Sequence, residues 1–157
     1  MAACWSTTDG PNHLRTKTSR RQEELPAQRI NFIHASARPQ FPALPAALAE
    51  MADIATNGEQ FWPGDAAPDV AHALAAAGYA IVGGEVYCRR AVGWAAYLGE
   101  WATSISRNSD HSWGEHVADG LADALSAIAR DPGAWGEPAE SGENLRYFFA
   151  ASAPPSQ

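Results

Sequence analysis

The sequence has only two cysteines, Cys4 and Cys88, in 157 residues. Two cysteines this far apart cannot form the disulfide framework of a small secreted domain, and they lack the spacing of a zinc site. No apolar run approaches the roughly 20 residues that a membrane-spanning helix needs. The first basic residues follow the weakly apolar start instead of preceding it, which is not the order of a secretory signal. We therefore expect a cytoplasmic protein with two reduced thiols and no membrane partner.

Basic residues are also scarce, and their shortage is confined to the later part of the chain. The sequence has 11 Lys and Arg against 18 Asp and Glu, which gives a net charge of −7. Residues 1–30 carry 5 basic and 3 acidic side chains, and the rest of the chain carries 6 basic and 15 acidic ones. An acidic domain repels nucleic acid and attracts basic surfaces, although such a charge also serves solubility alone. We expect no nucleic-acid partner, and a protein partner with a basic surface.

The motifs of common catalytic sites are missing as well. There is no nucleophile elbow, Walker loop or dinucleotide-binding fingerprint. The densest set of potential metal ligands is Asp110, His111, Glu115 and His116. Its spacing differs by one residue from the inverted zincin pattern, and Glu115 also completes a capping box with Ser112 at a helix start. We therefore expect no enzyme, cofactor or metal; the alternative is a small metal-binding protein or enzyme that uses His111, Glu115 and His116.

The core-forming residues lie between a polar start and a proline-rich end. Residues 1–28 are rich in Thr, Ser, Arg and Gln without apolar periodicity, and we expect a disordered N-terminal tail there. Residues 153–157 are expected to form a disordered C-terminal end. The segment between them, 29–152, is long enough for one core and short for two, so it is predicted to form a single domain.

Apolar periodicity within this domain predicts helices and strands that are largely segregated along the chain. The expected order is helix, helix, strand, strand, helix, strand, over 46–57, 67–77, 79–87, 92–104, 112–131 and 145–152. A short strand at 30–34 would lie at a sheet edge, and Phe61 and Trp62 would lie in a turn. This order favours an α+β fold, with a small, mainly antiparallel sheet and helices packed on one face.

The third of these elements, GYAIVGGEVY, has the glycine pair Gly83–Gly84 in the middle of a strand. Glycine inside a strand marks a bulge, a sharp bend or the close approach of other atoms. A bulge would re-aim Glu85 and Tyr87, an acid and an aromatic residue suited to anchoring a protein partner. The competing interpretation is that the glycines give Trp94 or Trp101 room to pack against the sheet.

An ordered set of motifs resembles the bacterial family immunity protein 40, whose members are found beside polymorphic toxins. The motifs are GYAIVGGEVY, YLGEW, SWGEHVADGLADALSAIA and RYFFAAS, within residues 43–152. The resemblance implies an α+β protein without enzymatic activity. Such a protein binds and neutralises, by stoichiometric contact, a cognate toxin domain made by the same cell.

The resemblance also indicates candidate partner-binding residues. The Gly-Gly-acid-Val-Tyr motif of the family falls on 83–87, and its aromatic-acid-Trp motif falls on 97–101, where Leu98 and Gly99 depart from the family pattern. Together with the strand analysis, this predicts a partner-binding set of Glu85, Tyr87, Tyr97, Glu100 and Trp101.

Overall fold

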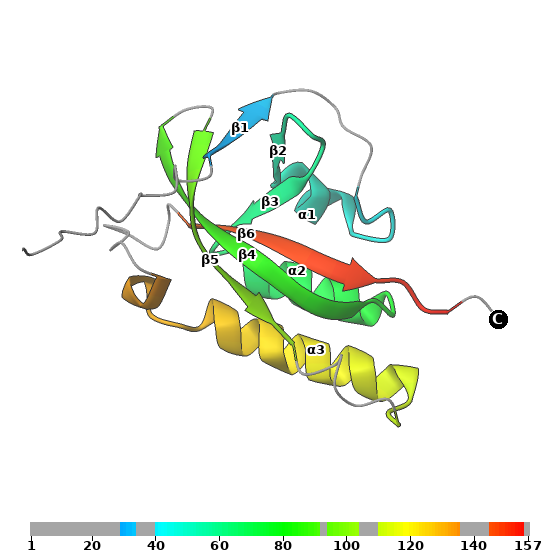
Figure 1. Ribbon diagram of the computed structural model, residues 1–157. Coiled ribbons are helices and arrows are strands. Elements are labelled where there is room, and N and C mark those ends of the chain that lie inside the picture. Colours follow the sequence, from blue (N-terminus) through cyan, green and yellow to red (C-terminus); the bar gives the residue numbers. More distant parts are fainter. Residues whose placement is uncertain (1–28, 34–39, 92–93, 104–109, 136–144, 156–157) are drawn as a thin grey trace, which may run out of the picture.

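The computed structural model describes residues 29–33, 40–91, 94–103, 110–135 and 145–155 (Figure 1). The predicted N-terminal tail and the last two residues lie outside this part of the chain. In order, the elements are β1 (Arg29–Ile33), α1 (Ala46–Glu50), β2 (Asp53–Ala55), β3 (Gln60–Pro63), α2 (Ala67–Ala76), β4 (Ala80–Ala91), β5 (Trp94–Ala102), α3 (Trp113–Ile128), the 3₁₀-helix η2 (Pro132–Trp135) and β6 (Leu145–Ser152).

The described strands form one antiparallel sheet that closes on itself in the order β1-β2-β3-β6-β4-β5. The long strands β5, β4 and β6 lie side by side in that order, and the shorter strands β1, β2 and β3 close the sheet between β5 and β6 (Figure 1). Helices α2 and α3 pack against each other and against β4. The predicted α+β fold with an antiparallel sheet is confirmed.

Strand alternation gives the sheet two different faces. Leu145, Tyr147 and Phe149 of β6 point toward the helices and join the main core, together with Val70 and Leu74 of α2. The inner face of the closed sheet holds a second, smaller cluster built on Phe61 and Tyr87. Each large side chain buried in this way contributes about 1.5–3 kcal/mol to folding. The helix-facing side buries more of these side chains and is therefore the major core. The cluster on the other side of the sheet is smaller.

The prediction of one helix over 46–57 is wrong beyond Glu50. Asp53 to Ala55 form β2, which pairs with both β1 and β3. Gly58 has φ 88° and lies in the turn between β2 and β3, where a left-handed backbone conformation favours glycine. Pairing on both sides, and contacts of Asp53 with two arginines, outweigh the helix propensity of this alanine-rich segment.

Two further predictions are corrected by the closure of the sheet. β1 pairs with β2 on one side and with β5 on the other, so it is not an edge strand. Phe61 and Trp62 lie in β3 and are 0% exposed, because the closing strand turns Phe61 inward and Trp62 toward the helices. Closure depends on long-range pairing, which local turn chemistry does not reveal.

The predicted capping box at the start of α3 is confirmed. The Glu115 carboxylate accepts hydrogen bonds from the Ser112 backbone N–H at 2.6 Å and from its hydroxyl at 2.7 Å, and the Ser112 Oγ accepts from the Glu115 N–H at 3.4 Å. These bonds with Ser112 hold the pKa of the Glu115 carboxyl below its ordinary value. Its contribution to stability is therefore present above the unfolded pKa and is lost as the pH falls through the lower folded pKa.

Ser112→Ala is expected to lower the free energy of unfolding by about 1 kcal/mol, because the N-cap hydroxyl is lost. Urea unfolding at neutral pH measures this change. Ser126→Ala, at an exposed position of the same helix, is the matched control and should change stability by less than about 0.5 kcal/mol. Equal effects of the two substitutions would contradict the capping role of Ser112.

Candidate functional site

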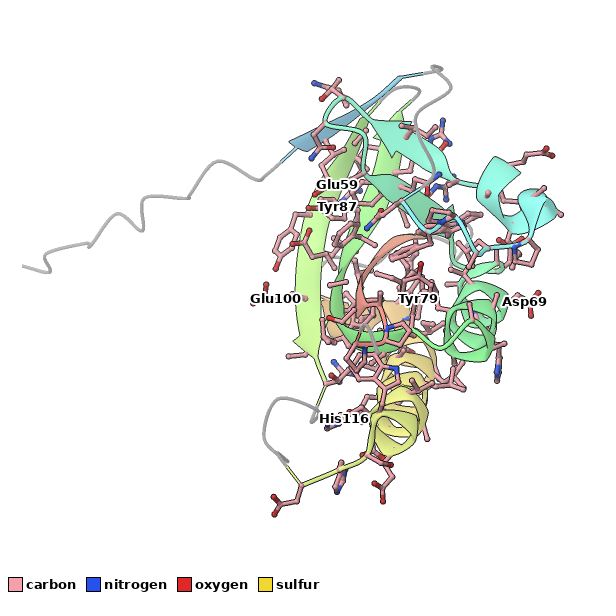
Figure 2. The ribbon with its side chains drawn as sticks, turned by 90° about the vertical axis from the view of Figure 1, so that its right-hand side faces the viewer. Glu59, Asp69, Tyr79, Tyr87, Glu100 and His116 are labelled. Carbon is pink, nitrogen blue, oxygen red and sulfur yellow. The ribbon has the colours of Figure 1, made fainter. Side chains whose placement is uncertain are left out.

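A hollow of about 440 Å³ lies on the face of the sheet opposite the helices. Figure 2 shows Glu100 on this side of the strands and Asp69 of α2 on the far side of the molecule. We call this site the acidic hollow. Its lining comes from the three long strands: Gly83, Gly84 and Glu85 of β4, Glu100, Trp101 and Ala102 of β5, and Phe148 and Ala150 of β6.

The floor of the acidic hollow is built from small residues in register. Gly83 pairs with Ala102 on one side and with Ala150 on the other. The register against β6 shifts between Ile81 and Gly83, which confirms the predicted irregularity in this strand. Because these three paired residues have small side chains or none, the sheet has an open depression at this point.

The structure explains why a glycine stands at position 84, in the middle of β4. A Cβ atom at this position would lie 2.1 Å from Cη2 of Trp101 and 2.2 Å from the backbone oxygen of Phe148. The indole of Trp101 occupies this space and packs edge-on against Tyr147 and Phe149, at centroid distances of 6.2 and 5.9 Å. The prediction that glycine makes room for Trp101 is confirmed, and the Trp94 side chain lies outside the described residues.

Two carboxylates face each other across the strands at the edge of this floor. Glu85 of β4 is the direct register partner of Glu100 of β5. Like charges directly opposite each other in a sheet destabilise it. Glu85 is half-buried and Glu100 is exposed, so this pair brings negative charge to the surface without a basic residue in the hollow lining.

Two tyrosines lie beside these carboxylates. The Tyr87 hydroxyl donates a hydrogen bond to Oε2 of Glu85 at 2.7 Å, and Tyr97 is close enough to Glu100 for the charge of that residue to raise the pKa of its phenol. Their rings meet edge to face with centroids 5.4 Å apart. Burial raises the pKa of both phenols, and the neighbouring glutamates raise it further. Both phenols therefore stay protonated at neutral pH, and Tyr87 holds the Glu85 carboxylate in position.

A third acid contributes to the negative charge of this region. Glu59 is close enough to Tyr87 to raise the pKa of its phenol, and it is half-buried. Figure 2 shows Glu59 beside Tyr87, on the same side of the molecule as Glu100. Negative charge therefore extends from the acidic hollow to Glu59, in the turn before β3.

The structure brings together all five residues of the predicted partner-binding set. They do not play equal parts, because Tyr87 is 3% exposed and Trp101 is 7% exposed. Trp101 packs in the helix-facing core and Tyr87 in the smaller cluster, whereas Glu85 and Tyr97 are half-buried and Glu100 is exposed. Of the five, Glu85, Glu100 and Trp101 line the acidic hollow. The predicted set is Glu85, Tyr87, Tyr97, Glu100 and Trp101.

The sequence analysis missed the β6 side of the acidic hollow and also Glu59. Phe148 lies opposite Glu85 and is half-buried, and Ala150 lies opposite Gly83. The period-2 alternation of the last strand carried a usable signal, since Phe148 must face away from Tyr147 and Phe149. No comparable pattern marks Glu59, which comes close only through the turn between β2 and β3.

The alternative metal or enzyme site at the start of α3 gains no geometric support. Glu115 is engaged in the capping box, and Nδ1 of His111 lies 3.1 Å from Oδ2 of Asp119. The rings of His111 and His116 are 5.8 Å apart. Within the described residues, no three or more His, Cys, Asp or Glu side chains are grouped to hold a metal ion.

Comparisons of the chain with protein-family models, with curated proteins and with solved structures found no match. Among the helices in the described ranges, none is both long enough and apolar enough to cross a membrane. The functional interpretation therefore depends on the geometry of the acidic hollow and on the sequence motifs.

Proposed function

We propose that this protein is an immunity-type protein that binds a cognate toxin domain of a polymorphic toxin system and neutralises it by stoichiometric contact. It acts in the cytoplasm of the bacterium that makes the toxin, and it has no enzymatic role. The acidic hollow is the binding surface, and the toxin domain presents a basic surface to it.

The facing pair of Glu85 and Glu100 is the observation that carries this proposal. A cross-strand pair of like charges costs stability in the free protein, and a cation placed between the carboxylates removes that cost. The Tyr87 hydroxyl fixes the Glu85 carboxylate in advance, so less side-chain entropy is lost on binding. The net charge of −7 adds long-range attraction for a basic partner.

The uncovered floor supports a macromolecular partner. Ala102 is exposed and Ala150 is half-buried, so this part of the lining presents small methyl groups that allow another chain to approach closely. Phe148 adds a half-buried aromatic ring beside the carboxylates. An apolar centre with charged groups around it is the usual arrangement of a protein-protein interface.

Glu100→Lys is expected to weaken the complex with the toxin domain by about 2 kcal/mol or more, because it places a positive charge against a basic partner. Stability should change by less than about 0.5 kcal/mol, since Glu100 is exposed. Isothermal titration with the purified cognate toxin domain gives both the affinity and the stoichiometry.

Asp69→Lys is the matched control, because it makes the same charge change at an exposed position on the opposite side of the molecule (Figure 2). It should leave the affinity within about 0.5 kcal/mol of the parent, apart from the general effect of net charge. Equal losses for the two variants would mean that only overall charge matters. No loss with Glu100→Lys would exclude the acidic hollow as the interface.

A further inference from the structure

We propose that the partner adds an extended, basic strand to the open edge of β5, which is the side of residues 100–102 that faces away from β4. The added strand pairs with β5 by backbone hydrogen bonds. This inference rests on the proposed function and names the element that the toxin domain contributes. Three observations carry it: the short pairing of β1 with β5, the direction of the backbone groups in β5, and the charge beside them.

The closed sheet leaves the second half of β5 with a neighbouring strand on one side only. β4 pairs with β5 as far as Ala102. β1 pairs with the first half alone, and its described pairing ends at Ala96. Figure 2 shows β5 along one margin of the sheet, with Glu100 beside it. In the part of the chain that the structure describes, no strand pairs with this side of β5 beyond Ala96.

The backbone groups of Glu100 and Ala102 point to the open edge. In an antiparallel pair, successive residues direct their N–H and C=O groups alternately toward the neighbouring strand and away from it. The Thr103 N–H donates to the Val82 oxygen of β4 at 3.1 Å, so Thr103 and, two residues earlier, Trp101 face β4. Glu100 and Ala102 alternate with them and face outward, and both residues are exposed. Unpaired N–H and C=O groups at the edge of a sheet are a template for another strand.

The sequence of the open edge lacks the usual protection against strand addition. Natural edge strands are commonly blocked by lysine, proline or a bulge. Residues 98–102 include no lysine and no proline, and the register shift of β5 comes before Gly99. Glu100 and Ala102 also line the acidic hollow, so the side chains of an added strand have room on that face. The open edge therefore admits both the backbone and the side chains of another strand.

Charge selects another protein as the occupant over a second copy of this chain. Glu100 lies on the open edge, and Glu85 lies directly opposite it on β4. Two copies paired edge to edge about Glu100 would bring their Glu100 side chains together, and like charges in opposite positions destabilise a sheet. A lysine or arginine opposite Glu100 in a partner strand forms a favourable pair instead.

The same argument disfavours the segment that precedes β1 in the sequence. Residues 22–28 include two glutamates and a proline and no basic residue. They do not offer the positive charge that Glu100 selects, and proline lacks the N–H that a paired strand donates. A basic strand of a partner protein fits the open edge better than either source within this chain.

The test uses the full ¹⁵N-labelled chain and a synthetic probe, the acetylated and amidated peptide Thr-Val-Lys-Val-Thr. The peptide is titrated to about 10 mM, a range suited to the millimolar affinity expected of so short a strand. We expect saturable shifts of the Glu100 and Ala102 amides. The same peptide methylated on the lysine backbone nitrogen keeps its charge but loses a backbone donor, and it should bind at least about tenfold more weakly. A peptide with glutamate in place of lysine should also bind at least about tenfold more weakly, because it opposes Glu100.

Ala102→Pro removes an outward N–H from the open edge. The pairing of β5 with β4 uses Trp101 and Thr103, and proline is tolerated in a strand where its nitrogen faces solvent, so the amide spectrum should stay dispersed. Binding of the lysine peptide should fall at least about tenfold. Ala102→Ser keeps the N–H and is the matched control, with binding within about twofold of the parent.

Four results would each overturn the inference. They are equal binding of the plain and methylated peptides, equal binding of the lysine and glutamate peptides, no saturable shift of the Glu100 and Ala102 amides, and unchanged peptide binding in folded Ala102→Pro. If Ala102→Pro does not fold, the plain and methylated peptides on the parent chain decide the question.

Titration with the purified cognate toxin domain separates this inference from the proposed function. If the toxin domain binds the parent one to one and binds folded Ala102→Pro equally well, the proposed function stands and strand addition is wrong. If the toxin domain does not bind the parent while the lysine peptide binds as expected, the open edge stands as a strand receptor and the proposed function fails.

Discussion

Gly84→Val is expected to lower the free energy of unfolding by at least about 3 kcal/mol. The new Cβ would lie 2.1 Å from the Trp101 ring and 2.2 Å from the Phe148 backbone oxygen. Overpacking of a rigid core costs about 1–3 kcal/mol, and a clash with backbone costs more, because β6 itself must move. A small domain has only about 5–15 kcal/mol of stability, so this loss is a large share of the total and should lower the midpoint of unfolding clearly.

Gly114→Ala is the control for a glycine whose Cβ has space. Nothing lies within 4 Å of a Cβ at this position in α3, so alanine should stabilise the helix by up to about 1 kcal/mol. Trp101→Leu combined with Gly84→Val should not restore the fold, because the clash with the Phe148 oxygen remains. Thermal and urea unfolding measure all three variants; a Gly84→Val protein as stable as the parent would contradict the account of the glycine pair.

Asp53→Ala is expected to lower the free energy of unfolding by about 2–4 kcal/mol, the range for losing the shared partner of two mostly buried charges. The Asp53 carboxylate accepts from Arg89 at 2.9 Å and also from Arg146. The side chains of Asp53, Arg89 and Arg146 are only 22%, 27% and 11% exposed. This ion cluster ties β2 to β4 and β6 across the closed sheet, so its loss should loosen the closure.

Asp119→Ala removes a carboxylate from a more exposed pair and serves as the control. Its partner is His111, with the two side chains 42% and 36% exposed, and such surface pairs contribute about 0–1 kcal/mol. Urea unfolding monitored by tryptophan fluorescence gives both values, and hydrogen exchange should show faster opening of β1 and β2 in Asp53→Ala alone. Similar losses in the two variants would mean that the ion cluster does not hold the sheet closed.

The elements that sequence patterns predicted well are those with strong local signals. The helices over α2 and α3 have apolar periodicity and clear ends, with Gly78 after α2 at φ 82° and the capping box before α3. The last strand was predicted with the bounds that β6 has, because its alternation is strong and two prolines follow it closely. Local propensity and tertiary packing agree in these elements.

The misplaced elements are those that long-range pairing decides. An alanine-rich pattern at 46–57 predicts a helix, yet β2 takes its second half because β1 and β3 pair with it from both sides. Phe61 and Trp62 lie in a short strand beside a proline and a glycine, where local chemistry indicates a turn. Closure of a sheet is a property of strands distant in sequence, and no single segment encodes it.

The residues of the candidate site also divide into those with a local sequence signal and those placed by long-range pairing. Gly83, Gly84 and Glu85 stand out in the sequence because they interrupt a strand. The facing of Glu85 and Glu100 depends on the register of β4 with β5, which shifts between Val86 and Tyr87. At this shift Val86 pairs with Gly99 and Tyr87 with Tyr97, so β5 has one extra residue there. Register of this kind is visible only in three dimensions.

The most direct test of the acidic hollow as the toxin-binding surface is a map of amide shifts when the ¹⁵N-labelled chain is titrated with the unlabelled toxin domain. We expect the largest changes at one-to-one stoichiometry to fall on Gly83, Gly84, Glu85, Glu100 and Phe148. Amides on the outer sides of α2 and α3 should keep their positions. Shifts concentrated on those helices, or no shift at equimolar toxin domain, would contradict the proposal.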